Sequence, residues 1–414
     1  ESPSKSTISF TVQDNSSVMS YLVVLSDDTG KVIDWKALTK ELKQQFEFNG
    51  DALTITIIQK ELWQGQYSVT LKTYTDVFKG DYIISSRYGG LSTEPFVSTG
   101  TISLEFNDIF YNLYPDSENE LVREQKYYGN TGDVKSVTLS LKDSPINLYV
   151  GLNKYDGNPH RYYFNPLVKM GETLVFNNNV YNSLPVMKTK YANVGEITSA
   201  NVYVLGNATK SKKQIVATNI YSSVVSGSEV PIYYPDALLG NLFTDFTTNI
   251  SYYDKTGGYN AIRSRSREPL DSYQPLDVNF NFSDSTKIKT TSKLISFPVT
   301  GKAQYMGIMF SKVEINATHK WFIYSEFTNN ASITLPVFPD ELYKNAGLTF
   351  IEKMRREKVW FVENNNLGSY TAFYTAHMKG KGQTDTSDNL RQKAYDFTPS
   401  ILFGDEEGRK SRNE

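Results

Sequence analysis

The segment "YSVTLKTY", residues 67–74, decides the fold class of this 414-residue chain. Neighbouring side chains of a β-strand point to opposite faces of the sheet. Tyr67, Val69 and Leu71 therefore share one face, and the polar residues between them share the other. An apolar row opposite a polar row is typical of a half-buried strand in an antiparallel sheet.

Similar short strand patterns, separated by turn residues, recur along the whole chain. Examples are "STISFTV" (6–12), "ALTITIIQ" (52–59), "INLYVGLN" (146–153), "YMGIMFSKVEI" (305–315) and "KWFIYSEF" (320–327). A parallel α/β fold would need a helix between consecutive strands, and the sequence shows almost none. We therefore predict an all-β protein of tandem antiparallel β-sandwich domains, immunoglobulin-like or transthyretin-like, with one or two short helices.

One segment has the spacing of a helix. In "DWKALTKELKQQF" (34–46), the apolar residues Trp35, Leu38, Leu42 and Phe46 recur at helical intervals, and the segment begins with an aspartate that can act as an N-cap. We expect this helix to pack on a sheet or to bridge two sheets.

Two segments about a hundred residues apart resemble each other. "VPIYYPDALLGN" (230–241) and "LPVFPDELYKN" (335–345) both carry Pro-Asp, a leucine two residues later and a final asparagine. Proline presets φ for a turn, and aspartate accepts hydrogen bonds from nearby backbone groups. We interpret both segments as junctions between a strand and a connection.

These patterns suggest three consecutive domains and a tail. The expected boundaries are an N-terminal sandwich at 1–105, a middle sandwich at 106–235, a C-terminal sandwich at 236–378 and a charged tail at 379–414. Within the tail, "AYDFTPSILF" is apolar enough to dock as a last strand. The final "GDEEGRKSRNE" has the composition of a solvated terminus.

Composition argues against several classes of function. Forty-three lysines and arginines balance 45 aspartates and glutamates, so nucleic acid is not an expected partner. Mean hydropathy is −0.43, and no apolar run approaches the ~20 residues of a membrane span. The chain has no cysteine, which rules out thiolate chemistry and disulfides.

Searches for catalytic, cofactor and metal motifs return nothing, so we predict no enzyme activity, no catalytic residues, no cofactor and no metal site. The three histidines, His160, His319 and His377, form no cluster with ligand spacing. The oxygen-rich segments "SDDTG" (26–30) and "NKYDGN" (153–158) lack the calcium-loop spacing and are interpreted as hairpin turns.

Aromatic residues give the best indication of a ligand. Four Tyr-Tyr pairs, at 127–128, 162–163, 233–234 and 252–253, should each bury one ring and present the other if they lie in strands. Exposed rings with polar neighbours can stack on sugars or anchor a protein partner. The candidate ligand-binding residues are His160, Arg161, Tyr162, Tyr163 and Trp63.

Two further groups of residues are candidates for binding. Arg263, Arg265 and Arg267 alternate in "IRSRSREP", so in an extended chain they line one face and could bind a carboxylate, sulfate or phosphate. Trp321 and Trp360 could also serve as sugar platforms, although their positions in "KWFIY" and "VWFV" favour burial.

The chain resembles the secreted, lipid-anchored surface proteins of Gram-negative bacteria that are built from tandem immunoglobulin-like or transthyretin-like sandwiches. The features that carry the resemblance are the "ESPSKST" start, the cysteine-free body, "YLVVLSDDTGKV", "QYSVTLKTY" and "LPVFPDEL". The resemblance implies an N-terminal lipid anchor, attached just before the mature chain, as the only membrane association.

Three functions follow as expectations. The first is a non-catalytic, extracytoplasmic cell-surface protein, a lipoprotein with a binding or adhesion role whose partner is a glycan or another surface protein. The second is a glycan-binding protein accessory to polysaccharide uptake across the outer membrane. The third is a polysaccharide hydrolase whose carboxylate pair, among 45 acidic residues, has no recognisable motif.

Overall fold

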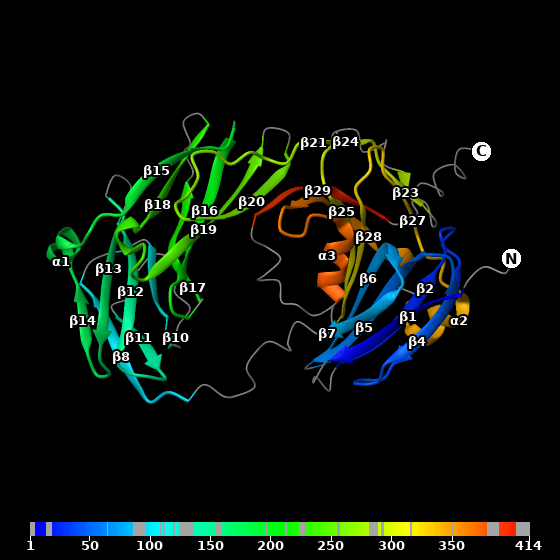
Figure 1. Cartoon of the computed structure of the whole chain (residues 1–414), viewed down its shortest axis with the longest axis horizontal. Coiled ribbons are helices and arrows are strands. Elements are labelled where there is room, and N and C mark those ends of the chain that lie inside the picture. The colour runs from blue at the N-terminus through cyan, green and yellow to red at the C-terminus, as the bar shows by residue number, and fades with distance from the viewer. Residues whose placement is uncertain are drawn as a thin grey trace. The chain divides into compact units, whose positions relative to one another are not determined.

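The computed structural model describes residues 5–13, 19–63, 65–85, 97–107, 110, 112–118, 121–123, 136–154, 159–195, 197–211, 213–222, 228–254, 257–280, 289–290, 294–314, 317–348, 351–378 and 389–402. They form an all-β sandwich fold of layered sheets with three short α-helices in the described part (Figure 1). The predicted fold class is confirmed.

The chain divides into two compact units. Unit 1 comprises Glu1–Ser92, Thr256–Tyr259 and Leu276–Glu414, and unit 2 comprises Thr93–Lys255 and Asn260–Pro275. This division differs from the three consecutive domains expected from the sequence, because strands from both ends of the chain share the sheets of unit 1. Strand alternation is a local signal and does not reveal which distant strands pair.

Eight neighbouring strands of unit 1 lie in the order β29-β28-β25-β26-β6-β5-β2-β3. Their bounds are β2 Met19–Ser26, β3 Val32–Leu38, β5 Ala52–Trp63, β6 Gln66–Phe78, β25 Tyr305–Glu314, β26 Ala317–Glu326, β28 Arg355–Asn364 and β29 Leu390–Leu402. All neighbours in this order are antiparallel except β6 and β26, which are parallel. β29 is the last strand expected from "AYDFTPSILF".

The opening segment forms β6, near the middle of this sheet. Val69 and Leu71 are buried on one face as predicted, whereas Tyr67 of the same row is exposed. The polar residues between them are half-buried. Thr73 and Tyr74 are also buried, so at this point the strand is covered on both faces. The pairing with β26 is parallel and was not predicted.

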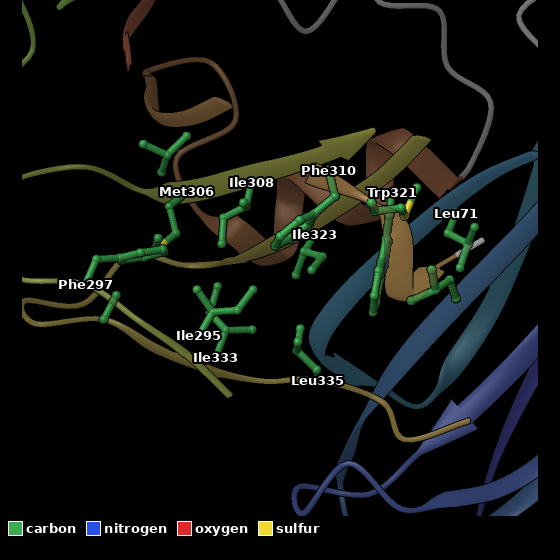
Figure 2. Packing of buried hydrophobic residues seen from close by; sticks show 14 of the residues in the cluster. Leu71, Ile295, Phe297, Met306, Ile308, Phe310, Trp321, Ile323, Ile333 and Leu335 are labelled. Atoms are coloured by element: carbon green, nitrogen blue, oxygen red, sulfur yellow. The ribbon is translucent and has the colours of Figure 1, made fainter. Parts of the chain in front are cut away.

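The first core of unit 1 lies against one face of the sheet. Phe310 of β25 and Trp321 of β26 pack here with Ile295 and Ile333, as Figure 2 shows. The covering elements are β21 Val278–Phe280, β23 Leu294–Ser296, β24 Val299–Gly301, β27 Ser332–Thr334, α2 Asp340–Ala346 and the short 3-10 helix η4 Ile351–Lys353. The short strand β22, Lys289–Thr290, pairs with β23. The indole Nε1 of Trp321 donates a 2.8 Å hydrogen bond to Thr73 Oγ1, which satisfies a buried donor.

The second core lies on the opposite face. Phe10 and Phe46 belong to the three-stranded sheet β4-β1-β7, and Tyr374 belongs to helix α3, Tyr370–Met378. The bounds of the three strands are β1 Lys5–Gln13, β4 Gln44–Asn49 and β7 Gly80–Ser85. The central sheet is therefore apolar on both faces, which explains continuous apolar runs such as "YLVVL" in β2.

The helix predicted for residues 34–46 is wrong. The segment instead supplies most of β3 and the start of β4. Trp35 pairs with Val24 of β2, and Phe46 and Phe48 are buried on alternate positions of β4. Packing against sheet neighbours therefore outweighs the local helical spacing.

The described part of unit 2 contains a row of four neighbouring strands and three small sheets. Their orders are β17-β16-β19-β20, β10-β11-β8-β14, β13-β12-β9 and β15-β18. The bounds are β8 Gly100–Phe106, β9 Asn112–Ser117, β10 Leu121–Arg123, β11 Ser136–Leu141, β12 Ile146–Asn153, β13 Arg161–Val168, β14 Thr173–Phe176, α1 Asn178–Ser183, β15 Lys188–Asn193, β16 Ile197–Ala208, β17 Gln214–Ser222, β18 Glu229–Tyr234, η2 Asp236–Leu238, β19 Phe243–Asp254 and β20 Tyr259–Ser266. Two apolar cores hold these sheets together.

The two Pro-Asp segments are junctions, as interpreted. Pro235 ends β18 and precedes the 3-10 helix η2, and Pro339 precedes α2. The leucine two residues after each aspartate is buried, Leu238 in unit 2 and Leu342 in unit 1. The shared chemistry is therefore a turn into a helix anchored by one leucine.

Candidate functional site

The predicted residues 160–163 lie at the start of β13 in unit 2. Tyr162 is buried and its ring stacks on Tyr149, with centroids 6.1 Å apart. Tyr163 is half-buried and meets the ring of Phe176 edge-to-face. Both tyrosines thus hold β13 in place, and Tyr162 is not available to a ligand.

His160 is a buried support. It is 8% exposed, and its ring stacks on Tyr233 of β18 with centroids 3.8 Å apart. Burial lowers the pKa of His160 to about 4, because the charged ring loses its hydration. The imidazole is therefore neutral at pH 7 and holds Tyr233 in a fixed orientation.

Arg161 also acts within the fold. Its Nη1 donates a hydrogen bond to the carbonyl oxygen of Leu184, and its guanidinium lies 5.4 Å from the centre of the Tyr181 ring. Both contacts tie β13 to the end of helix α1.

Beside His160, the outward side of the β15-β18 sheet presents aromatic and apolar residues. Tyr191 pairs with Pro231 across the two strands and is 62% exposed. Tyr233 lies two residues beyond Pro231 on the same side and is half-buried. We call Tyr191, Pro231 and Tyr233 the tyrosine face. Diagonal neighbours on one side of a sheet are close enough for two aromatic rings to contact one ligand.

The inward side of the same two strands carries charged groups. Tyr234 donates a 2.8 Å hydrogen bond to Glu268, and Lys188 contacts Glu268 at 3.3 Å. Burial raises the pKa of Tyr234 to about 12, and the bond from Tyr234 helps to lower the pKa of Glu268. Lys190 pairs with Asp271 at 2.9 Å, in contact with solvent. The strands that carry the tyrosine face are anchored by Ala192, Val230 and Ile232, which are buried in a core of unit 2.

The sequence did not point to Tyr191. In "KTKYAN" the inward positions are Lys188, Lys190 and Ala192, so the strand lacks an apolar row and shows no amphipathic pattern. The sequence feature that could have indicated an exposed ring is Tyr191 itself, which lies on the opposite side of the strand from Lys188 and Lys190.

The expectation of one buried and one presented ring is met in full by the pair at 252–253 and only in its buried ring by the other two described pairs. Tyr252 is 3% exposed and Tyr253 is 52% exposed. Tyr234 and Tyr162 are buried, whereas their partners Tyr233 and Tyr163 are half-buried. The pair at 127–128 lies outside the described residues.

The arginines at 263, 265 and 267 do not act as one group. Arg265 binds Asp245 through two hydrogen bonds of 2.8 and 3.1 Å, and Arg263 donates to Gln214 at 3.3 Å. Arg267 follows the end of β20 and is exposed. Asp245 already offers Arg265 a carboxylate, so anion binding by this set stays a prediction.

The tryptophans occupy different environments. The backbone of Trp63 ends β5, but its side chain lies outside the described residues. Trp321 is 1% exposed, as expected for a core position. Trp360 is half-buried on β28.

The oxygen-rich segment at 26–30 is a turn, as interpreted. Asp27 accepts hydrogen bonds from the backbone nitrogens of Thr29 and Lys31 and closes the hairpin between β2 and β3. Residues 155–158 of the second segment lie outside the described part. Across the residues that the structure describes, no three His, Asp or Glu side chains are grouped to hold a metal ion.

Among the residues that the structure describes, four carboxyl groups have shifted pKa values, and all four shifts are downward. Hydrogen bonds lower the pKa of Asp27, Glu47, Glu268 and Glu314. A general acid of a glycosidase needs a raised pKa, so these four groups lend no support to the hydrolase alternative.

Among the described residues, no helix has both the length and the apolar character needed to cross a membrane.

Comparisons with known proteins add little. No family model matches the chain, and no curated protein sequence does either. The solved structure of the pilus adhesin SpaC from Lactobacillus rhamnosus GG aligns with 81% of this chain and 44% of its own, at 10% sequence identity and a TM-score of 0.14. The chain thus spans less than half the length of that adhesin, and so low a TM-score carries no argument about function.

Proposed function

We propose that this protein is a non-catalytic binding protein that works outside the cytoplasm, where the tyrosine face of unit 2 recognises a glycan. The observation that carries the proposal is Tyr191, 62% exposed beside Pro231 and Tyr233 on one side of the β15-β18 sheet. At a cell surface or in a periplasm, the tyrosine face would be accessible to extended glycans.

The chemistry of the tyrosine face suits a sugar. An aromatic ring can stack on the apolar C–H side of a pyranose, while the phenol hydroxyl exchanges hydrogen bonds with sugar hydroxyls. The 3.8 Å stacking on His160 fixes Tyr233 before a ligand arrives, so less side-chain entropy is lost on binding.

The finer expectations are part of this proposal and differ in the origin of the glycan. In adhesion, the ligand belongs to another cell or to a surface protein. In polysaccharide uptake, the ligand is a chain delivered to an outer-membrane importer. Lipid anchoring stays a prediction from the resemblance, and membrane fractionation of the cells that make the protein tests it.

A glycan array tests the proposal. The wild type should bind a defined subset of glycans, and Tyr191→Ala should weaken this binding about tenfold, the effect of one stacked ring. Tyr253→Ala is the matched control, because Tyr253 is 52% exposed on β19 of the same unit, and it should bind as the wild type does.

Three results would contradict the proposal. The first is a wild type that binds no glycan, and the second is a Tyr191→Ala variant that binds as tightly as the control. The third is the release of shorter sugars from a bound glycan during incubation, which would show catalysis.

A further inference from the structure

Trp360 lies on the face of the unit-1 sheet that carries the second core. Its neighbours in the chain, Val359 and Phe361, point into the first core. Across the sheet, Trp360 pairs with Gly307 of β25 on one side and with Ala394 of β29 on the other. The large side chain of Trp360 thus lies between a glycine and an alanine on the neighbouring strands. Trp360 itself is half-buried.

Gly307 lets the indole lie directly over the backbone. A Cβ at position 307 would lie 2.2 Å from Cζ2 of Trp360 and 2.3 Å from its Cε2. The rings of Phe322 and Tyr324 stand at 67° and 75° to the indole, with centroids 6.3 and 5.9 Å away. One ring face therefore lies against Gly307, and we call the opposite face of the indole its outer face.

A charged pair lies next to this ring. Lys358 is two residues before Trp360 on the same side of β28, and its Nζ lies 3.2 Å from Oδ1 of Asp396, the cross-strand partner on β29. Both side chains are partly exposed, at 32% and 47%. The pair offers an adjacent donor and acceptor and little net charge, which matches neighbouring hydroxyl groups.

We propose that Trp360, Lys358 and Asp396 form a second sugar site, in unit 1, that binds an uncharged pyranose of a glycan chain. The ring stacks on the outer face of Trp360, Lys358 donates to one hydroxyl, and Asp396 accepts from its neighbour. The proposal rests on the proposed function for its class of ligand, but it depends on different residues.

Intrinsic fluorescence tests the site, because stacking of a sugar on an indole changes tryptophan emission. The probes are cellohexaose, maltohexaose, xylohexaose and mannohexaose, each titrated into the full chain. At least one should change the emission with saturation, and Trp360→Phe should remove most of the change. Lys358→Met and Asp396→Asn should each weaken binding about tenfold while the emission of the ligand-free protein stays the same.

The Tyr191→Ala and Tyr233→Ala double variant separates this site from the tyrosine face. It should keep the fluorescence response if the unit-1 site exists, even if it no longer binds on the array. A response that Trp360→Phe leaves unchanged, or no response to any of the four probes, overturns the second site and leaves the tyrosine face unaffected. Thermal melting of each variant confirms that it is folded.

Discussion

At the scale of single residues, His160 links stability to pH. Its pKa is about 4 in the folded protein and about 6.5 in an unfolded chain. Below pH 6.5 the unfolded state binds a proton that the folded state excludes, so the free energy of unfolding falls as the pH drops from 6.5 to 4. The shift corresponds to about 3 kcal/mol at most, since one pKa unit is about 1.4 kcal/mol.

Chemical denaturation of the wild type and His160→Gln at pH 7 and pH 4.5 measures this effect. The loss of stability between the two pH values should be smaller in the variant by about 2 kcal/mol, the part of the shift expressed by pH 4.5. Equal losses would show that His160 is not the group responsible. Carboxyl groups titrate in both proteins and cancel in the comparison.

Residue-scale predictions from the sequence succeeded where a simple alternation decides burial. The rule that one ring of each tyrosine pair is buried held for the three described pairs. The same reasoning places Tyr162 in a ligand site and misses Tyr191. Alternation predicts on which side of a strand a ring lies, but it does not predict which side is covered by another sheet. Whether a face is covered depends on contacts between distant segments.

At the scale of elements, the hairpin between β2 and β3 is joined to the Pro-Asp segment before α2. The backbone nitrogen of Val337 donates a 2.8 Å hydrogen bond to the carbonyl oxygen of Gly30. Gly30 has φ +83°, and a Cβ there would lie 2.2 Å from the carbonyl oxygen of Leu335. Only glycine fits this approach.

Gly30→Ala should therefore lower the free energy of unfolding far more than Gly368→Ala. Gly368 has φ +72° with nothing near its Cβ position, so alanine there costs about 1 kcal/mol from the left-handed backbone. Gly30→Ala adds a backbone clash and should cost about 3 kcal/mol. Thermal or urea unfolding of the two variants measures the difference, and similar losses would contradict the contact.

The mistaken helix at 34–46 shows the limit of periodicity at this scale. Its apolar spacing fits a helix, while "QQFEFN" at 44–49 also alternates as a strand. The segment forms strands because its first half pairs with β2 and its second half pairs with β1. The sequence thus predicted strands where one pattern was present and failed where two patterns overlapped.

At the scale of the whole molecule, each unit has cores of its own, so mutations should act on the unit that contains them. Leu342→Ala in unit 1 and Leu238→Ala in unit 2 each remove a buried leucine side chain, which costs about 3 kcal/mol. Calorimetry should show each variant shifting the transition of its own unit. A Leu342→Ala variant that shifted only the unit-2 transition would contradict the division.

The division itself could not be predicted from the sequence. Composition and alternation predict an all-β protein. They suggest a domain border wherever a run of strand patterns is interrupted. The final assignment depends on β29 pairing with β28 and on β26 pairing with β6. The second of these pairings joins residues 67–74 to residues 317–324, which are far apart in the sequence.

Hydrogen exchange measured by mass spectrometry, with and without the best ligand from the array, tests the central claim most directly. Glycan recognition by the tyrosine face predicts slower exchange in β15, Lys188–Asn193, and in β18, Glu229–Tyr234. Protein saturated with glycan that shows no protection in either strand would contradict the account.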